Sequence, residues 1–483
     1  MDSTFWRRPT LSLLALAICV TAAPSRRDNS VTIGDSTYQS GGLVAFGLIP
    51  SDFIESTGDT LGGIGSATTL KPGSWKALDN GTFTGTLVVE PDRGYNVVET
   101  IDYQARQHYI DFWLTPYTDS SKLSFEDAQL TLVLSYSHTV LLNERDGKKT
   151  TGLDSGSHRN ATGGDPVLPT PTSTDRLSLD VEGIVANEDG SFWISDEYGP
   201  YIYHFSAEGA LISTIAPPDA IIPKSKSGDY DFTSVEDPDT GRASNQGFEG
   251  LTIDNENHVL YAMLQTATVQ DGGDQKETSR YTRLLGWDIS DVSNAVLVGE
   301  WVVPLPQSKK GKTRGSNEIA FLRDGIFLSL TRDGNGRGDE DLQASYKQVD
   351  LFDISAATDI HGTKYDDPEH SLRKGGDGDL DDGVEPAQYY SFVDMLDEDG
   401  LARFGLQNSD DQDDKTHINA KFEGLVLAPT GKGDQYFLFV VSDNDFQTTQ
   451  GISLGQPFDA GIDVDNQFLV YTVTLPGLTG QIV

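Results

Sequence analysis

The chain has 483 residues, and its 35 Lys and Arg against 74 Asp and Glu give a formal net charge of −39 at pH 7. A surface this acidic repels a phosphate backbone, so the composition excludes nucleic acid as a partner. The only cysteine, Cys19, leaves no pair for a disulfide, so stability must come from a large core, which a chain of this length can bury.

The N-terminus has the pattern of a secretory signal peptide. Arg7 and Arg8 precede an apolar stretch at 11–20, and small residues follow at 21–23. The apolar stretch is too short to span a bilayer. We therefore predict a signal peptide over residues 1–23 and a secreted, extracellular protein. No later stretch is apolar enough to predict a membrane partner.

From residue 31 onward, helical periodicity is nearly absent. Apolar runs are short, rich in Val, Ile, Leu, Tyr and Phe, and separated by Gly, Asp, Asn and Pro. This pattern is typical of many short strands. A first, degenerate unit begins at 60–70 with a third strand at 106–114, and Asn-x-Thr sequons at Asn80 and Asn160 predict glycosylation of the surface.

A short sequence motif then occurs four times. Each copy has an apolar run opened by a glutamate, a turn, a second apolar run that ends in polar residues, and a third strand-like run. The copies open at Glu182, Glu249, Glu318 and Glu423, and their third runs lie at 201–209, 282–290, 346–355 and 466–475. A repeated β-rich unit predicts a propeller with blades of three or four antiparallel strands.

The spacing of the copies sets our expectation of the blade number. The first three glutamates are 67 and 69 residues apart, and the interval before the last is 105. We predict a single all-β propeller over residues 31–483 with six blades, and seven as the alternative. The long interval holds an acidic, Gly-rich stretch at 366–414, which we predict to be a surface insertion.

The repeated glutamates predict a metal site. The innermost strand of each blade lines the central channel, so equivalent residues face one another, and the antiparallel second strand ends at the same mouth. Clustered carboxylates cannot all stay ionised without a cation, and oxygen ligands favour Ca²⁺ over other divalent cations such as Mg²⁺ or Mn²⁺. The alternative for any one glutamate is a bulge whose carboxylate pairs with the backbone of a neighbouring blade. The expected ligands are Glu182, Asp196, Glu249, Glu318, Glu423, Asn444 and Asp445.

Positive residues are scarce, so those near the expected mouth stand out. Arg332 and Asp333 end a second strand, and Arg283 opens a third. An arginine there can clamp a phosphate or carboxylate, or equally neutralise the glutamates. We assign catalysis to Arg332 as phosphate clamp and to Asp333 or Glu197 acting on the water. The expected substrate contacts are Arg283, Arg332 and His204, with a framework role as the alternative for the histidine.

Three pairs of motifs and one single motif resemble the phytase-like family, which is described as having esterase-like activity of phytase. They are Asp-x-Glu-Gly at 180–183 with Ser-Asp-Glu-Tyr at 195–198, Asn-x-Gly-Phe-Glu-Gly-Leu at 245–251, Ser-Asn-Glu-Ile at 316–319 with Arg332-Asp333, and Phe-Glu-Gly-Leu at 422–425 with Asp-Asn-Asp-Phe at 443–446. The family often has a glutamate before Arg-Asp, where Thr331 stands here. The resemblance implies a secreted β-propeller with hydrolase activity, but it supplies no catalytic residue set.

Three functions are compatible with these features. The leading hypothesis is a metal-dependent hydrolase of phosphate esters that acts on a small anionic ester. The second is a carboxylester or lactone hydrolase with the same cation as Lewis acid. The third is a calcium-stabilised binding protein without enzymatic activity. Two or more arginines or lysines beside the metal would favour phosphate, and we expect a monomer.

Overall fold

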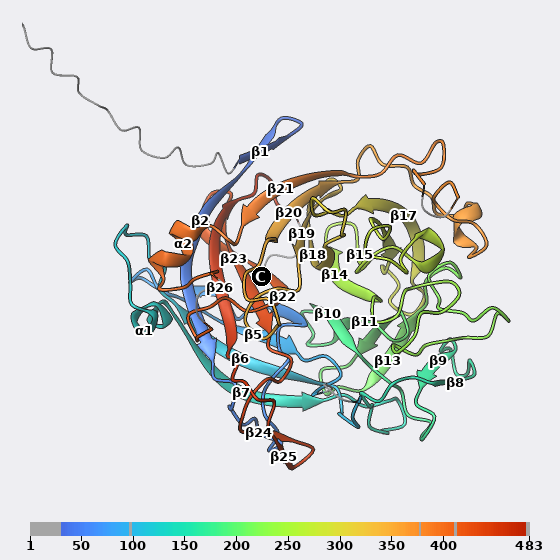
Figure 1. The fold of residues 1–483 in the computed structure, drawn as a ribbon, viewed down its shortest axis with the longest axis horizontal. Helices are drawn as coiled ribbons and strands as arrows, with labels where there is room; N and C mark the ends of the chain where they lie inside the picture. Colours follow the sequence, from blue (N-terminus) through green and yellow to red (C-terminus); the bar gives the residue numbers. More distant parts are fainter. Residues whose placement is uncertain (1–29, 96–98, 376–377, 410–412, 480–483) are drawn as a thin grey trace, which may run out of the picture.

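A computed structural model describes residues 30–95, 99–375, 378–409 and 413–479, so the predicted signal peptide lies outside the described residues. The described residues form five large antiparallel sheets arranged as blades around a central channel (Figure 1). The innermost strands of neighbouring blades contact one another in a closed ring. The predicted all-β propeller is therefore confirmed, whereas six blades, and seven as the alternative, are wrong for this part of the chain.

The first three blades each follow the predicted order of strands from the channel outwards. The first contains β3 (Ala67–Leu70), β5 (Phe83–Glu90), β6 (Arg106–Leu114) and β7 (Leu132–Leu141), with β4 (Lys76–Ala77) beside β5. The second contains β10 (Val181–Ala186), β11 (Phe192–Asp196), β12 (Ile202–Phe205) and β13 (Leu211–Ile215). The third contains β14 (Phe248–Asp254), β15 (Val259–Leu264), β16 (Tyr281–Asp288) and β17 (Val296–Pro304).

The last two blades contain the ends of the described chain and the long interval. The fourth contains β18 (Gly315–Arg323), β19 (Ile326–Arg332), β20 (Lys347–Asp353) and β21 (Gln388–Asp394). The fifth contains β22 (Lys421–Lys432), β23 (Gln435–Asp443), β26 (Asn466–Thr474), β2 (Ser36–Ile49) and β1 (Ser30–Ile33). Because β21 lies within 366–414, the stretch predicted as a surface insertion also supplies a blade strand.

The ring is closed by strands from opposite ends of the chain. In Figure 1 the blue β2 lies beside the red β26, and the two pair antiparallel with Gly47 opposite Phe468. β26 pairs in turn with β23, which lies next to the channel strand β22. Backbone hydrogen bonds thus hold the first and last strands of the propeller in one sheet, which removes an open seam between blades.

Short elements decorate the connections between strands. Two ribbons, β8 (Ser157–Arg159) with β9 (Leu168–Thr170) and β24 (Gly451–Ser453) with β25 (Gln456–Phe458), occupy loops, as do the helices α1 (Phe125–Ala128) and α2 (Glu398–Arg403). These connections lengthen the chain between blade strands without adding a further large sheet to the described residues. The sequon residues Asn80 and Asn160 are both exposed, and their glycosylation stays a prediction.

The hydrophobic core lies between blades. Trp193 of the second blade packs in one cluster with Phe248 and Trp287 of the third, and Tyr261 of the third packs with Phe327 of the fourth. Each sheet is therefore buried on both faces, and apolar burial of this kind contributes about 25 cal/mol per Å². This packing explains how the fold forms without disulfides.

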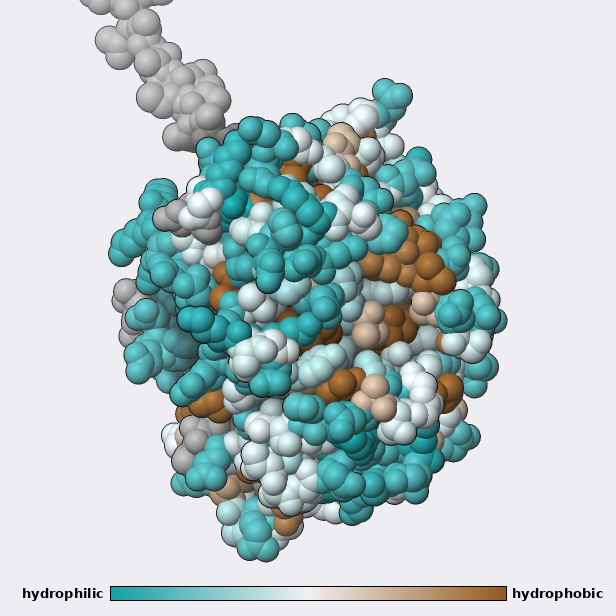
Figure 2. All heavy atoms as spheres, turned by 90° about the vertical axis from the view of Figure 1, so that its right-hand side faces the viewer, coloured by the Kyte–Doolittle hydropathy of each residue, from teal (hydrophilic) through white to brown (hydrophobic). Residues whose placement is uncertain are grey.

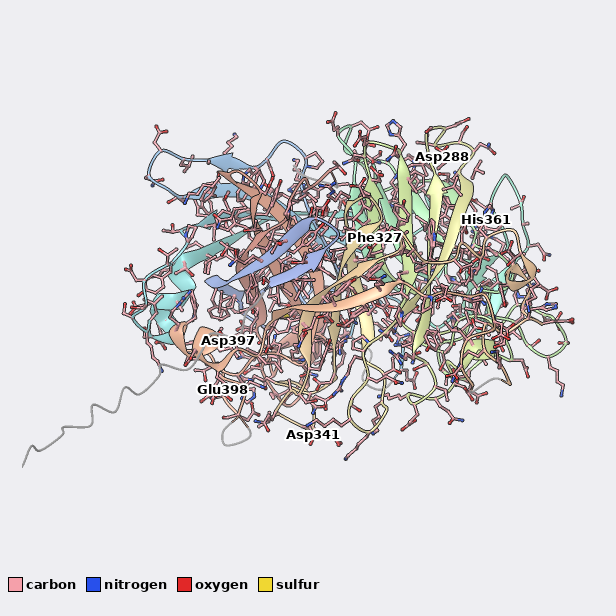
Figure 3. The ribbon with its side chains drawn as sticks, turned by 90° about the horizontal axis from the view of Figure 1, so that it is seen from above. Asp288, Phe327, Asp341, His361, Asp397 and Glu398 are labelled. Atoms are coloured by element: carbon pink, nitrogen blue, oxygen red, sulfur yellow. The ribbon has the colours of Figure 1, made fainter. Side chains whose placement is uncertain are left out.

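The loops that follow the strands lie at opposite sides of the ring. Figure 3 shows Asp341, in the loop after β19, on the opposite side of the molecule from Asp288, which ends β16. Inside the channel, apolar side chains that include Ile184, Leu251 and Leu425 leave a void of only about 40 Å³. The channel is therefore narrow where these side chains line it.

The outer surface agrees with the acidic composition. Figure 2 shows a face that is mainly hydrophilic, with hydrophobic patches between the polar side chains. No helix within the described ranges is both long and apolar enough to cross a membrane.

Candidate functional site

A cavity of about 820 Å³ opens where the first strands of the blades begin and the second strands end. The predicted residues Glu182, Glu197, Glu249, Glu423 and Asp445 all line it. The antiparallel return of the second strand brings these groups together, as the repeat predicted. Basic side chains also line this cavity: Arg93, Lys276, Lys312, Arg314, Arg332 and Lys421.

A β-bulge near the start of four channel strands turns one side chain toward the cavity. The extra residue of the bulge is Glu182 in β10, Glu249 in β14 and Glu423 in β22. In β18 the same position is occupied by Asn317, and Glu318 is the next residue along. The ring therefore consists of three carboxylates and one amide. It differs from the ring expected from the sequence by one residue in β18, where Asn317 takes the place of Glu318.

The structure places Glu318 outside the predicted metal site. Its Oε1 accepts hydrogen bonds from the backbone N–H of Leu251 at 2.9 Å and of Ile319 at 2.8 Å. It does not line the cavity. Burial raises its pKa well above the usual range for a glutamate. Glu318 thus joins two blades through backbone contacts, which is the alternative role considered for a bulge glutamate.

The glycine after each bulge glutamate is needed for the close approach of neighbouring blades. A Cβ placed on Gly183 would lie 2.6 Å from the carbonyl oxygen of Glu249. A Cβ on Gly250 would lie 2.8 Å from the backbone nitrogen of Ile319. The Glu-Gly motif therefore combines a cavity-facing carboxylate with a contact that leaves no space for a side chain.

The first of two carboxylate clusters is formed by Asp180, Glu182 and Glu197. All three are buried, and one oxygen atom from each lies within 4.8 Å of the others. Arg93 Nη1 is 3.0 Å from Asp180 Oδ2, whereas neither glutamate forms a salt bridge in the described part of the chain. Burial, the charge of Glu249 and the other cluster carboxylates raise the pKa of Glu182 well above its usual range.

The second cluster, formed by Asp92, Asp443 and Asp445, already contains a cation from the protein. Its oxygen atoms meet the same 4.8 Å spacing. Lys421 Nζ is 2.7 Å from Asp445 Oδ1 and also pairs with Asp443. Burial acts to raise the pKa of Asp445, but Lys421 outweighs it and the pKa is lowered. The two clusters are alike in geometry, but they differ in how far basic side chains neutralise them. Arg93 pairs with one carboxylate of the first cluster, whereas Lys421 pairs with two of the second.

Arg332 lies at the cavity wall but is engaged by a ring carboxylate. Its Nη2 donates to Glu423 Oε1. Burial acts to raise the pKa of Glu423, and Lys421 and Arg332 together reverse this and lower it. The guanidinium of Arg332 therefore has a fixed orientation beside the cavity.

Asp333 also lines the cavity, but its carboxylate orders the loop after β19. One oxygen, Oδ2, accepts from the backbone N–H of Ser345 at 2.8 Å, from its hydroxyl at 2.6 Å and from the backbone N–H of Tyr346 at 3.0 Å. These contacts give Asp333 a positioning role in the loop, in place of the predicted role in activating water.

Two buried oxygen atoms at the cavity have neither a hydrogen-bond partner nor a salt bridge among the described residues. They are Glu249 Oε2 and Asn317 Oδ1, on side chains that belong to residues only 2% exposed. The other Glu249 oxygen accepts from Gln265 Nε2 at 2.6 Å, and Asn317 Nδ2 donates to Glu423 Oε1 at 3.4 Å. Leaving a buried polar atom unpaired costs about 1–3 kcal/mol, so such atoms point to a ligand.

Two other expected metal ligands are part of the scaffold. Asp196 Oδ2 accepts from the backbone N–H of Asp180 at 2.7 Å. Asn444 accepts from the backbone N–H of Gly63 at 2.9 Å and donates to the carbonyl of Val464 at 2.8 Å. Neither residue lines the cavity, because each side chain turns back to satisfy backbone groups at the end of its strand.

Two expected substrate contacts also lie elsewhere. Arg283 is fully buried within the third blade and pairs with Asp271 and Glu300, each at 2.8 Å. His204 stacks on Trp193 with ring centroids 4.1 Å apart, which is the framework role considered for it. Strand alternation directs both side chains into a blade and away from the channel, so we assign neither to substrate.

The sequence contained a signal for the residues that we missed. Asp92 and Arg93 follow β5, the second strand of the first blade, so the rule that second strands end in polar residues also applies there. Lys421 starts the Phe-Glu-Gly copy, and Asn317 precedes the glutamate in its own copy. Asn317 was recognisable only by aligning the bulges, because a glutamate stands next to it.

Fold and site together define a class of protein: a closed β-propeller with a carboxylate-rich cavity at one channel mouth. The family model of the phytase-like family, described as esterase-like activity of phytase, matches residues 75–446. The chain belongs to this family.

Similar proteins have been found by sequence and by structure. A protein from Arthroderma benhamiae, described as an uncharacterized secreted protein, is 38% identical over 466 residues, which cover 87% of this chain and 90% of the relative. The major Malassezia sympodialis allergen Mala s 1 matches with a TM-score of 0.32 and 13% identity over 90% of this chain and 89% of its own. A glycosyl hydrolase from Bacteroides ovatus matches with a TM-score of 0.36 and 10% identity over 89% and 93%.

Proposed function

We propose that the chain is a secreted hydrolase that uses a divalent cation, Ca²⁺ in the first instance, to cleave the phosphate ester of a small anionic molecule. Family membership and the secreted relative support the broad class. One observation carries the finer proposal. Asp180, Glu182 and Glu197 form a buried cluster whose negative charge the protein only partly compensates, beside a cavity that also has a basic wall.

The first cluster fits a calcium ion in size and chemistry. Calcium takes oxygen ligands at about 2.3–2.6 Å, so two of its ligands are at most about 5 Å apart. The 4.8 Å limit among Asp180, Glu182 and Glu197 meets this condition. The second cluster meets it too, but Lys421 occupies the position of a cation there. We therefore place the ion at the first cluster.

The cavity residues have separate tasks in this proposal. A bound cation supplies Lewis acidity toward a phosphoryl oxygen and offsets the charge that develops there. Glu249 Oε2, which has no partner in the described residues, is placed to accept a hydrogen bond from the attacking water. Arg332, held by Glu423, contacts the phosphate. Glu197 belongs to the cation cluster in this arrangement, and its predicted role with the water becomes that of a ligand.

The basic lining favours a phosphate ester over a carboxylic ester. Two or more arginines or lysines beside the metal favour phosphate, because each adds a positive charge that a phosphoryl group can contact. Arg332 and Lys421 line the same cavity as the first cluster, as do Arg93, Lys276, Lys312 and Arg314. A phosphoryl group carries more negative charge than a neutral ester carbonyl, so it gains more from these side chains.

Elemental analysis before and after chelation, combined with two activity assays, tests the proposal. Phosphate release and nitrophenyl-ester cleavage should be measured on wild type, Glu182→Gln and a control, Glu188→Gln, whose carboxylate is exposed on the same blade. We expect bound calcium and phosphate release in wild type and control, and loss of both in Glu182→Gln. Ester cleavage that exceeds phosphate release would favour the carboxylester or lactone alternative. Calcium without either activity would favour the binding-protein alternative.

A further inference from the structure

One loop at the cavity mouth is basic in a chain that is otherwise strongly acidic. Residues 308–314 read Ser-Lys-Lys-Gly-Lys-Thr-Arg, with four cationic side chains in seven positions. Lys312 and Arg314 of this loop line the cavity, together with Lys276 from the preceding loop. Lys309 and Lys310 are exposed and do not line it. The positive charge is thus concentrated at one side of the rim.

The basic loop has an ordered backbone. Gln307 and Thr313 form an antiparallel bridge across its base. Inside the loop the backbone N–H of Ser308 donates to the carbonyl of Lys312 at 2.8 Å, and Gly311 has a φ of 80°, which allows the tight turn. The position of Lys312 relative to the cavity is therefore set by backbone hydrogen bonds.

The basic loop is joined to the loop that carries Lys276. The backbone N–H of Thr313 donates to the carbonyl of Lys276 at 2.7 Å, and Gln307 Nε2 donates to the carbonyl of Glu277 at 3.1 Å. The two loops connect β15 to β16 and β17 to β18, so both belong to the rim of the third blade. Lys276 and Lys312 therefore lie on one connected structure.

The positive charges of Lys276 and Lys312 are not compensated by a salt bridge within the described structure. Neither Lys276 nor Lys312 has a salt bridge in the ranges that the structure describes. The deeper Arg332 and Lys421 differ, because Glu423 pairs with the first, and Asp443 and Asp445 pair with the second. Unpaired positive charge at a cavity mouth raises the local concentration of an anion, and it does so most strongly at low ionic strength.

We propose that Lys276, Lys312 and Arg314 form a second anion subsite, which selects substrates with an additional anionic group away from the bond that is cleaved. Arg314 is oriented for this by Ser345 Oγ, 2.8 Å from its Nη2, and by Asp333 Oδ2, 3.5 Å from its Nη1. The substrate class is an ester with a phosphate, sulfate or carboxylate on its non-reacting part. The link to cleavage rests on the proposed function, whereas anion binding at the rim does not.

Calorimetric binding of two matched probes tests the subsite. The probes are hexane-1,6-diol bisphosphate and hexyl phosphate, at one fixed calcium concentration and two salt concentrations. We expect wild type to prefer the bisphosphate, and Lys312→Gln and Lys276→Gln each to weaken it roughly fivefold while leaving hexyl phosphate nearly unchanged. Lys309→Gln is the matched control, because it removes the same charge from the same loop without affecting the cavity lining. Equal losses for both probes, a similar loss in the control, or no preference in wild type would overturn the subsite.

The outcome separates the subsite from the proposed function because binding needs no turnover. Lys312-dependent binding of the bisphosphate without hydrolysis of either probe would uphold the subsite and contradict the hydrolase proposal. Hydrolysis of both probes at equal rates, unaffected by Lys312→Gln, would uphold the hydrolase proposal and contradict the subsite.

Discussion

Asn317 occupies in β18 the bulge position that Glu249 occupies in β14, and both side chains present an unpartnered, buried oxygen atom at the same cavity. The amide adds no charge, and its Nδ2 donates to Glu423. A carboxylate in that place would face Glu423 directly and would be repelled. The cavity therefore gains an oxygen ligand or acceptor without a further negative charge.

A first prediction compares Glu249, which lines the cavity, with Glu318 of the neighbouring blade, which does not. Glu249→Gln should lessen the calcium-dependent rise in melting temperature, because it removes a negative charge next to the first cluster. That rise corresponds to about 4 kcal/mol at a thousandfold excess of calcium over its dissociation constant. Glu318→Gln is the control: its amide oxygen can still accept from the backbone N–H groups of Leu251 and Ile319, and its side chain lies outside the cavity, so the calcium response should not change. Thermal melts with and without calcium are the measurement, and an unchanged response in Glu249→Gln would contradict the proposed site.

A second prediction concerns the cation that the protein supplies to the second cluster. Lys421→Gln removes the cation that pairs with the buried Asp443 and the part-exposed Asp445, so it should destabilise the protein by about 3–5 kcal/mol in the presence of a chelator. Calcium should restore part of this loss, since the vacated cluster keeps the 4.8 Å spacing. Lys421→Arg is the control that retains the charge. Urea unfolding with and without calcium checks both statements, and a loss that calcium does not reduce would show that this cluster cannot take the ion.

A third prediction separates the phosphate contact from the metal site. Arg332→Ala should lower the turnover of phosphate release by about 10²–10³, the usual effect of losing one preorganised charge at a transition state. Arginine does not ligate a cation, so the calcium-dependent stability should persist. Activity and thermal melts should be measured on the same preparations. Ester cleavage that exceeds phosphate release and survives Arg332→Ala would move the assignment to the esterase or lactonase alternative.

A fourth prediction follows from a buried histidine in β6, the third strand of the first blade. Burial, with a smaller contribution from Arg106, lowers the pKa of His108 to about 3. His108 then stays neutral in the folded protein while the unfolded chain takes up a proton below about pH 6.5. Its contribution to stability is therefore present above pH 6.5 and is lost as the pH falls toward 3, by up to about 1.4 kcal/mol per pH unit.

Urea unfolding at several pH values between 7 and 4 tests this prediction. His108→Gln should make the free energy of unfolding fall less steeply with decreasing pH than in wild type. The control is His138→Gln, on the exposed face of the adjacent strand β7. An equally steep fall in His108→Gln and wild type would show that this residue does not carry the effect.

The repeat in the sequence was sufficient to predict a propeller, the order of strands within a blade and the meeting of Glu182, Glu249 and Glu423 at one channel mouth. These features depend on local patterns: apolar runs of strand length, turns of Gly and Asp, and a glutamate at a fixed point of each unit. The rule for polar strand ends was also general enough to include Asp92 and Arg93, although we did not apply it to the first blade.

The tertiary structure decided what local patterns leave open. Five blades close the ring because long connections, and not a further sheet, use the extra residues, and because β2 pairs with β26 across the whole length of the chain. A one-residue bulge put Asn317 in the place expected for Glu318. The carboxylates that pair with Arg283, Arg332 and Lys421 could not be predicted from the sequence either. A side chain's charge is neutralised by groups that lie near it in space, and these can be distant in sequence.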